Sequence, residues 1–216
     1  MKRVFGTVEM VFDILYLCIA VVIGCILLFM PGHTNARILA GIMALVLAGG
    51  DSFHLIPRIR TIAGGESESL NTALGRGKQI TSITMTIYYL LLWHIGVMLL
   101  PAAPSQVWTC LIYLLAAVRI ALCFSPQNKW LDRYPPVSWG IYRNIPFFLM
   151  GIETSLLFLL HKFDMTGLGW MWLAILLSFA FYLPVVLWAN KNPKIGMLML
   201  PKTCVYVWML VMCLSL

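Results

Sequence analysis

The densest group of chemically competent side chains lies in residues 49–58, which read GGDSFHLIPR. Asp51 and His54 are three residues apart and Arg58 follows four residues later, so a helix would carry all three on one face. On such a face a carboxylate, a titratable imidazole and a cation would form a line, in which Asp51 could act as a general base. The same groups could instead form ion pairs that hold helices together, and the sequence favours neither interpretation.

Several further ionisable side chains interrupt long apolar stretches of the chain. A charge at the centre of a bilayer costs about 2.5–3.5 kcal/mol on insertion scales, so such groups face a bundle interior, a partner or water. The candidates outside residues 49–58 are Asp13, His94, Arg119, Glu153 and Lys202. If these acids and bases come together from different helices, they form a polar pocket within the membrane.

The composition of the chain places these groups in a membrane protein. Of the 216 residues, 61% are hydrophobic and 11% are charged, whereas a soluble domain is about one quarter charged. This composition excludes a disordered chain, a disulfide scaffold and a nucleic-acid-binding domain. Membrane lipids are therefore the expected partners, with a small molecule or a lipid as ligand. No nucleic acid, metal or cofactor is expected.

Seven apolar runs are long enough to cross the hydrocarbon layer, which takes about 20 helical residues. They predict an all-α fold, a single domain formed by a polytopic bundle of seven transmembrane helices. The predicted spans are approximately 8–30, 37–57, 80–100, 107–124, 145–161, 169–190 and 197–216. An odd number of spans places the two termini on opposite sides of the membrane.

The distribution of lysine and arginine predicts the orientation of the bundle. The N-terminal segment and the second, fourth and sixth loops hold 11 of these residues, whereas the other loops hold only Arg37 and Lys162. Because positive charge accumulates on the cytoplasmic side, we expect a cytoplasmic N-terminus and an external C-terminus. The predicted location is the cell (cytoplasmic) membrane.

Six ionisable groups then fall at a similar depth near the cytoplasmic edge. A rise of about 1.5 Å per helical residue places them within roughly 12 Å of that edge. These residues are Asp13, Asp51, His54, Arg119, Glu153 and Lys202. We predict that they build a polar, ligand-binding pocket open to the cytoplasm. His94 falls in the outer half of the membrane, where a hydrogen-bonded core histidine is expected.

Two long connections lie on the predicted cytoplasmic side. Residues 58–79 are rich in Gly and Ser with mixed charge, which predicts a flexible loop. Residues 125–144 combine aromatic and cationic side chains, as membrane interfaces do, and predict an interfacial lid or, alternatively, a plain aromatic anchoring belt. The next helix is expected to follow this lid, with Asn144 as its cap and Pro146 in its first turn.

The run Gly50-Asp51-Ser52-Phe53-His54-Leu55-Ile56-Pro57-Arg58 resembles the Gly-Asp helix end of the lysoplasmalogenase-like integral membrane family. The resemblance covers one helix and its exit. It implies a hydrolase that acts on vinyl-ether lysolipids through intramembrane acids, with Asp51 at the matching position. Glu153, in Gly151-Ile152-Glu153-Thr154, is the acid that would stand in for the second motif of the family.

Three functions stay open from the residues alone. The first is binding or transport of a small polar or amphiphilic solute. The second is hydrolysis of a lipid or lysolipid, with Asp51 and Glu153 as acid and base and His54 as a further catalytic candidate. The third is a structural membrane subunit in which the buried charges form ion pairs between helices. The sequence does not predict the oligomeric state.

Overall fold

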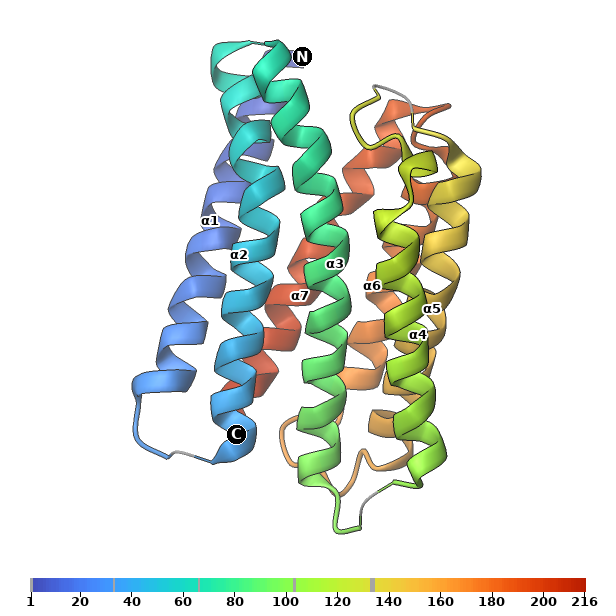
Figure 1. Cartoon of the computed structure of the whole chain (residues 1–216). Coiled ribbons are helices and arrows are strands. Elements are labelled where there is room, and N and C mark those ends of the chain that lie inside the picture. Colours follow the sequence, from blue (N-terminus) through green and yellow to red (C-terminus); the bar gives the residue numbers. More distant parts are fainter. Residues whose placement is uncertain (1, 33, 66, 103, 133–134) are drawn as a thin grey trace.

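The computed structural model describes residues 2–32, 34–65, 67–102, 104–132 and 135–216 (Figure 1). Within these ranges the fold is all-α, as predicted, with seven α-helices and three short 3-10 helices. The helices are α1 (Lys2–Phe29), α2 (Asn35–Gly64), α3 (Glu68–Leu99), α4 (Gln106–Phe124), η1 (Pro126–Asn128), α5 (Val137–Leu160), α6 (Met171–Trp188), η2 (Pro193–Leu198), α7 (Met199–Met212) and η3 (Cys213–Ser215). In the described part of the chain, seven helical segments are long and apolar enough to cross a membrane.

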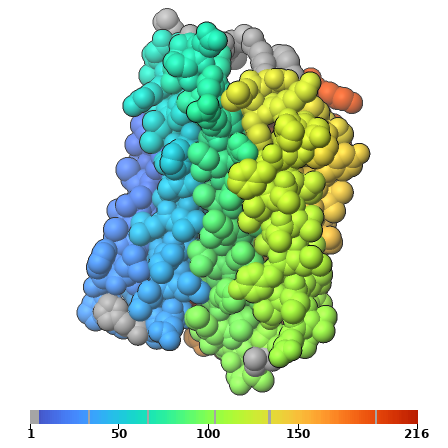
Figure 2. All heavy atoms as spheres, in the orientation of Figure 1, coloured from blue at the N-terminus to red at the C-terminus, as the bar shows by residue number. Residues whose placement is uncertain are grey.

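The helices form a closed ring in which each helix packs against its neighbours in the chain. α7 packs against both α6 and α1 and so closes the ring, while α3 also touches α5 across it. Lys2 and Leu216 lie at opposite ends of the bundle (Figure 1). We call the end at which α1 begins the N-terminal end. In the space-filling view the surface is continuous from α1 across α2 and α3 to α4 (Figure 2).

α2 and α3 approach each other closely because small residues line their contact. A Cβ added to Gly50 would overlap the side chain of Thr84, and one added to Gly77 would overlap the backbone of Phe53. The hydroxyl of Thr81 also donates a hydrogen bond to the Gly50 carbonyl oxygen, at 2.9 Å. The α2–α3 contact therefore fixes the position of the 49–58 segment against α3.

The flexible loop predicted at 58–79 is wrong, because this segment is almost entirely helical. α2 continues to Gly64, and α3 begins at Glu68 after the cap residue Ser67, whose hydroxyl accepts a hydrogen bond from the Leu70 N–H. Pro57 lies inside α2 rather than at its end. Its missing N–H leaves the Phe53 carbonyl without its helical donor, and Gly77 of α3 packs against that same carbonyl. Close packing thus accommodates a residue that was expected to end the helix.

The start predicted for the fifth helix is also wrong. α5 begins at Val137, so Pro146 lies inside the helix and Asn144 is a buried residue within it. The Asn144 amide donates a hydrogen bond to the Gly140 carbonyl at 2.8 Å and accepts one from the Tyr182 hydroxyl at 3.1 Å. Residues 137–144 of the segment predicted as an interfacial lid are therefore the first two turns of α5.

An aromatic cluster fills the middle of the bundle between α3, α5, α6 and α7. We call it the aromatic floor and define it by Tyr88, Tyr89, Phe147, Phe179 and Tyr206, each at most 3% exposed. The rings of Tyr89 and Phe147 meet edge to face with centroids 5.0 Å apart, and those of Tyr88 and Tyr206 do so at 5.5 Å. This packing separates the two halves of the bundle interior.

Candidate functional site

A cavity of about 320 Å³ opens at the N-terminal end of the bundle, on one side of the aromatic floor. Phe147 belongs to both the floor and the cavity wall. The wall is otherwise largely apolar, with Met85, Val137, Val185 and Val186 among its members. Six segments of the chain contribute to it: α2, α3, α4, the 130–136 connection with α5, α6, and the start of α7. Hereafter we call this cavity the pocket.

Basic side chains from five different helices line the pocket. They are His54 of α2, Lys78 of α3, Arg119 of α4, Arg143 of α5 and Lys202 of α7. The described residues that line the pocket include no Asp or Glu. The uncharged polar groups on the wall are Thr81, Ser82, Tyr182 and Asn190, together with the indole of Trp130. The pocket is thus a cationic site in an apolar setting.

Arg119 is the most deeply buried of these cations, at 2% exposed. Its guanidinium lies over the Phe147 ring, with 3.3 Å between Cζ and the ring centroid. Among the described residues, the buried Nε and Nη1 atoms of Arg119 have no hydrogen-bond acceptor. Since an unpaired buried donor is costly, these two N–H groups favour an acceptor supplied by a ligand.

Arg143 is held in place by the connection between α4 and α5. Its Nη1 donates a hydrogen bond of 2.8 Å to Asn128 Oδ1, and its Cζ lies 4.3 Å from the centroid of the Trp130 ring. The Asn128 amide in turn donates to the carbonyls of Leu122 and Ser125 at the end of α4. This arrangement fixes the guanidinium at the pocket wall.

Lys202 lies between the pocket and a carboxylate behind it. Its Nζ is 4.7 Å from the ring centroid of Tyr182 and 5.0 Å from that of Tyr206. Asp51 lies within electrostatic range of this ammonium group. The Tyr16 hydroxyl donates a hydrogen bond of 2.6 Å to Asp51 Oδ2. Asp51 therefore stands next to the pocket without lining it.

The six residues predicted to share one pocket separate into four places. His54, Arg119 and Lys202 line the pocket, whereas Asp51 lies behind Lys202. Asp13 is buried on α1, within electrostatic range of Glu9, Arg58 and Asp51. Glu153 is buried on α5 at 4% exposed, and both of its carboxyl oxygens lack a hydrogen-bond partner within the described ranges.

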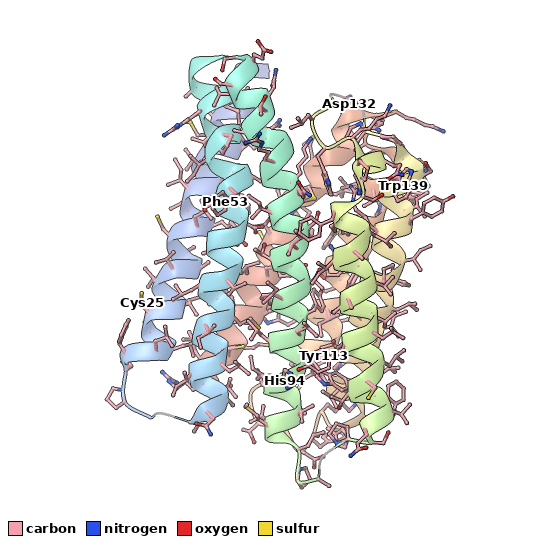
Figure 3. All side chains as sticks on the ribbon, in the orientation of Figure 1. Cys25, Phe53, His94, Tyr113, Asp132 and Trp139 are labelled. Atoms are coloured by element: carbon pink, nitrogen blue, oxygen red, sulfur yellow. The ribbon has the colours of Figure 1, made fainter. Side chains whose placement is uncertain are left out.

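The three residues that were predicted to line up on one face of α2, namely Asp51, His54 and Arg58, have different partners. Arg58 Nε binds Glu9 Oε1 at 2.8 Å, Asp51 binds Tyr16, and His54 faces the pocket. His94 lies away from the pocket in the lower half of the view in Figure 3, where its Nε2 is 2.6 Å from the Tyr113 hydroxyl oxygen, as expected for a hydrogen-bonded histidine.

Sequence reasoning missed Lys78 and Arg143 as pocket residues. Both lie in segments that were predicted to be a loop and a lid, so neither was counted among the intramembrane groups. The signal that could have found Arg143 is its spacing of four residues from Phe147, which places the two side chains on one face of a helix. Among the described residues, no group of three His, Cys, Asp or Glu side chains could hold a metal ion.

Comparisons with known proteins do not assign the chain to a family. No family model matches the chain, and neither a curated protein nor a solved structure is significantly similar to it. The resemblance of the Gly50-Asp51 segment to the lysoplasmalogenase-like family therefore stays a prediction, and the function has to be argued from the pocket itself.

Proposed function

We propose that this chain is a membrane protein that binds an anionic amphiphile in the pocket at its N-terminal end. The observation that carries the proposal is the charge of the pocket: basic side chains converge from five helices, and the described lining residues include no carboxylate to balance them. Desolvated cations are costly unless an opposite charge is close. A bound anion would supply that charge.

The apolar wall supports an amphiphile rather than a simple ion. A volume of about 320 Å³ is at the lower end of the range of roughly 300–1,000 Å³ for small-molecule pockets. A phosphate group between Arg119 and Lys202 would leave the surfaces of Val137, Val185 and Val186 for a hydrocarbon chain. A phosphate-bearing lipid with a single chain matches both parts of this wall.

The orientation of the bundle suggests where such a ligand comes from. The N-terminal end carries most of the Lys and Arg residues outside the apolar runs, so we infer that it faces the cytoplasm of the cell. The pocket then opens at the headgroup level of the inner leaflet. Binding, with or without translocation, follows from this placement, and we infer that the cell membrane is the location.

The alternative of a structural subunit receives less support from the contacts. Within the described ranges the ion pairs are Arg58–Glu9 and His161–Asp164. Neither pair includes Asp51, Arg119, Glu153 or Lys202, although these are the costly buried groups. A subunit held together by ion pairs would be expected to pair them.

The alternative of a hydrolase rests on Asp51 and Glu153 acting together. Asp51 is hydrogen-bonded to Tyr16 of α1, whereas neither carboxyl oxygen of Glu153 has a hydrogen-bond partner among the described residues. Neither carboxyl lines the pocket. We therefore propose ligand binding as the function and keep hydrolysis as the second candidate, to be tested by incubation of any bound lysolipid.

The test compares lipids that differ only in the charge of the headgroup. The full chain, purified in a neutral detergent, is titrated with lysophosphatidic acid, with lysophosphatidylcholine of the same chain length, and with inorganic phosphate, while thermal unfolding is recorded. We expect the anionic lysolipid to raise the unfolding temperature most. Arg119→Gln and Lys202→Gln should abolish this shift, and Arg60→Gln, an exposed position outside the pocket, should retain it. Equal shifts with both lysolipids would overturn the proposal.

A further inference from the structure

The proposed ligand site leaves a second group of ionisable residues unused. It lies on α1 and α2, behind the pocket, and consists of Glu9, Asp13 and Asp51 with the hydroxyl of Tyr16. Glu9 is paired with Arg58 at 2.8 Å. Asp13 stands within electrostatic range of both Glu9 and Asp51. These acids extend from the N-terminal end of the bundle to the back of Lys202.

Asp51 is the member of this group that lies next to the pocket, although it does not line it. From α1 it faces Tyr16 and Asp13, from α3 Tyr88, and from α7 Lys202. On its own helix His54 lies one turn further on and faces Lys202 as well. Of these groups Lys202 is the strongest base. Asp51 and Lys202 do not form a direct ion pair, but the ammonium group of Lys202 acts electrostatically on the Asp51 carboxylate in the empty pocket.

A ligand anion would compete with Asp51 for this ammonium group. When the anion binds at Lys202, two negative charges share one cation in a largely apolar setting, and their repulsion is strong there because screening is weak. Protonation of the Asp51 carboxylate removes this repulsion. The neutral acid can still hydrogen-bond to Tyr16, since a carboxylic acid donates through its own O–H and a tyrosine oxygen accepts.

We propose that Asp51 takes up one proton when the anion binds beside Lys202, so that ligand and proton bind together. This inference rests on the proposed function. Asp13 and the Glu9–Arg58 pair lie between Asp51 and the N-terminal end of the bundle, and they give the proton a route from water that avoids the occupied pocket. The transfer of this proton is the only change in covalent bonding.

The proton is counted by isothermal titration calorimetry at neutral pH in buffers of different ionisation enthalpy. The probe is lysophosphatidylglycerol, whose phosphodiester does not titrate near neutral pH. We expect uptake of about one proton per ligand in the wild-type chain. The uptake should fall close to zero in Asp51→Asn, which still binds the probe. Asp132→Asn, an exposed acid in the connection near the pocket (Figure 3), serves as the matched control and should behave as wild type.

Each outcome decides between the two proposals. Binding without proton uptake overturns this inference and leaves the proposed function standing, as does full uptake in Asp51→Asn. Failure of the wild-type chain to bind overturns the proposed function and the inference with it. An infrared difference spectrum of the wild-type chain gives an answer that needs no variant: addition of the probe should produce the carbonyl band of a protonated carboxyl group, which moves to lower frequency in D₂O whereas the ester carbonyl band of the probe does not. Absence of a deuterium-sensitive band contradicts the proposal.

Discussion

The guanidinium of Arg119 lies over the ring of Phe147, with 3.3 Å between Cζ and the ring centroid, while two of its buried nitrogen atoms have no hydrogen-bond partner within the described ranges. The aromatic face favours the cation, but it does not replace the missing hydrogen-bond acceptors. The ring therefore holds Arg119 in position while two of its N–H groups lack a hydrogen-bond acceptor, as expected of a group that binds a ligand.

Replacement of Arg119 by methionine should separate binding from stability. We expect the affinity for an anionic lysolipid to fall at least tenfold, or about 1.4 kcal/mol. The free energy of unfolding without ligand should hold or rise by about 1 kcal/mol, because an apolar side chain replaces an unpaired buried charge. Thermal unfolding with and without the lysolipid measures both effects. A large loss of stability in the empty protein would show that Arg119 is structural.

The contact between α2 and α3 predicts a contrast between two glycines. Gly77→Ala should destabilise the protein by about 1–3 kcal/mol, because the new methyl group meets the backbone of Phe53 and His54 rather than a flexible side chain. It should also weaken ligand binding, since His54 lines the pocket. Gly49→Ala is the matched control: nothing lies within 4 Å of its Cβ position, so a neutral or slightly stabilising effect is expected. Unfolding of both variants in the same detergent checks the contrast, and equal losses would contradict it.

The hydrogen bond between Tyr16 and Asp51 predicts a coupling that a double-mutant cycle measures. Tyr16→Phe removes the donor and leaves a partly buried carboxylate without it, so we expect a loss of about 1–3 kcal/mol at neutral pH. In the Asp51→Asn background the same replacement should cost less, because the amide carries no charge. Additive losses in the cycle would show that the two residues do not depend on each other.

The aromatic floor predicts one-sided access to the pocket. In a variant that lacks the six native cysteines, none of which forms a disulfide, Ser82→Cys places a thiol at the pocket wall. A membrane-impermeant thiol reagent should label it only from the cytoplasmic side, and an anionic lysolipid should slow the reaction.

The control for this experiment is Thr166→Cys, an exposed position on the connection between α5 and α6. It should react only from the outside, which tests the predicted orientation as well. Labelling of Ser82→Cys from both sides would indicate a second conformation in which the floor opens, as a transporter requires. Labelling from the outside alone would reverse the orientation.

The fold was largely predictable from the sequence because long apolar runs specify membrane spans directly. α4 and α6 begin and end within two residues of the spans predicted at 107–124 and 169–190. The ends of α2, α3 and α5 were not predictable in the same way. The additional turns of α2 follow Pro57, those of α5 precede Pro146 and those of α3 are polar, and tertiary contacts keep them helical despite these signals.

The pocket was predictable only in part. The depth of a residue in the membrane follows from its position along the helix, whereas the direction in which its side chain points does not. Counting along the chain placed Arg119, Lys202 and Glu153 in one layer, and the first two do line the pocket. Which side a helix turns toward its neighbours depends on packing contacts such as Gly50 against Thr84. Next to Glu153, Gly151 of α5 packs closely against Phe179 of α6, and no count along the chain reveals such a contact.

The length of α2 and α3 has a mechanical consequence for the mouth of the pocket. Helices of 30 and 32 residues extend about 45 Å, roughly 15 Å more than the hydrocarbon layer is thick. The pair extends beyond the rest of the bundle at the N-terminal end (Figure 1). On the other side of the mouth, α4 and α6 have only 19 and 18 residues. The rim is therefore tall on one side and low on the other, and in the proposed orientation a lipid from the inner leaflet would enter the pocket over the low side.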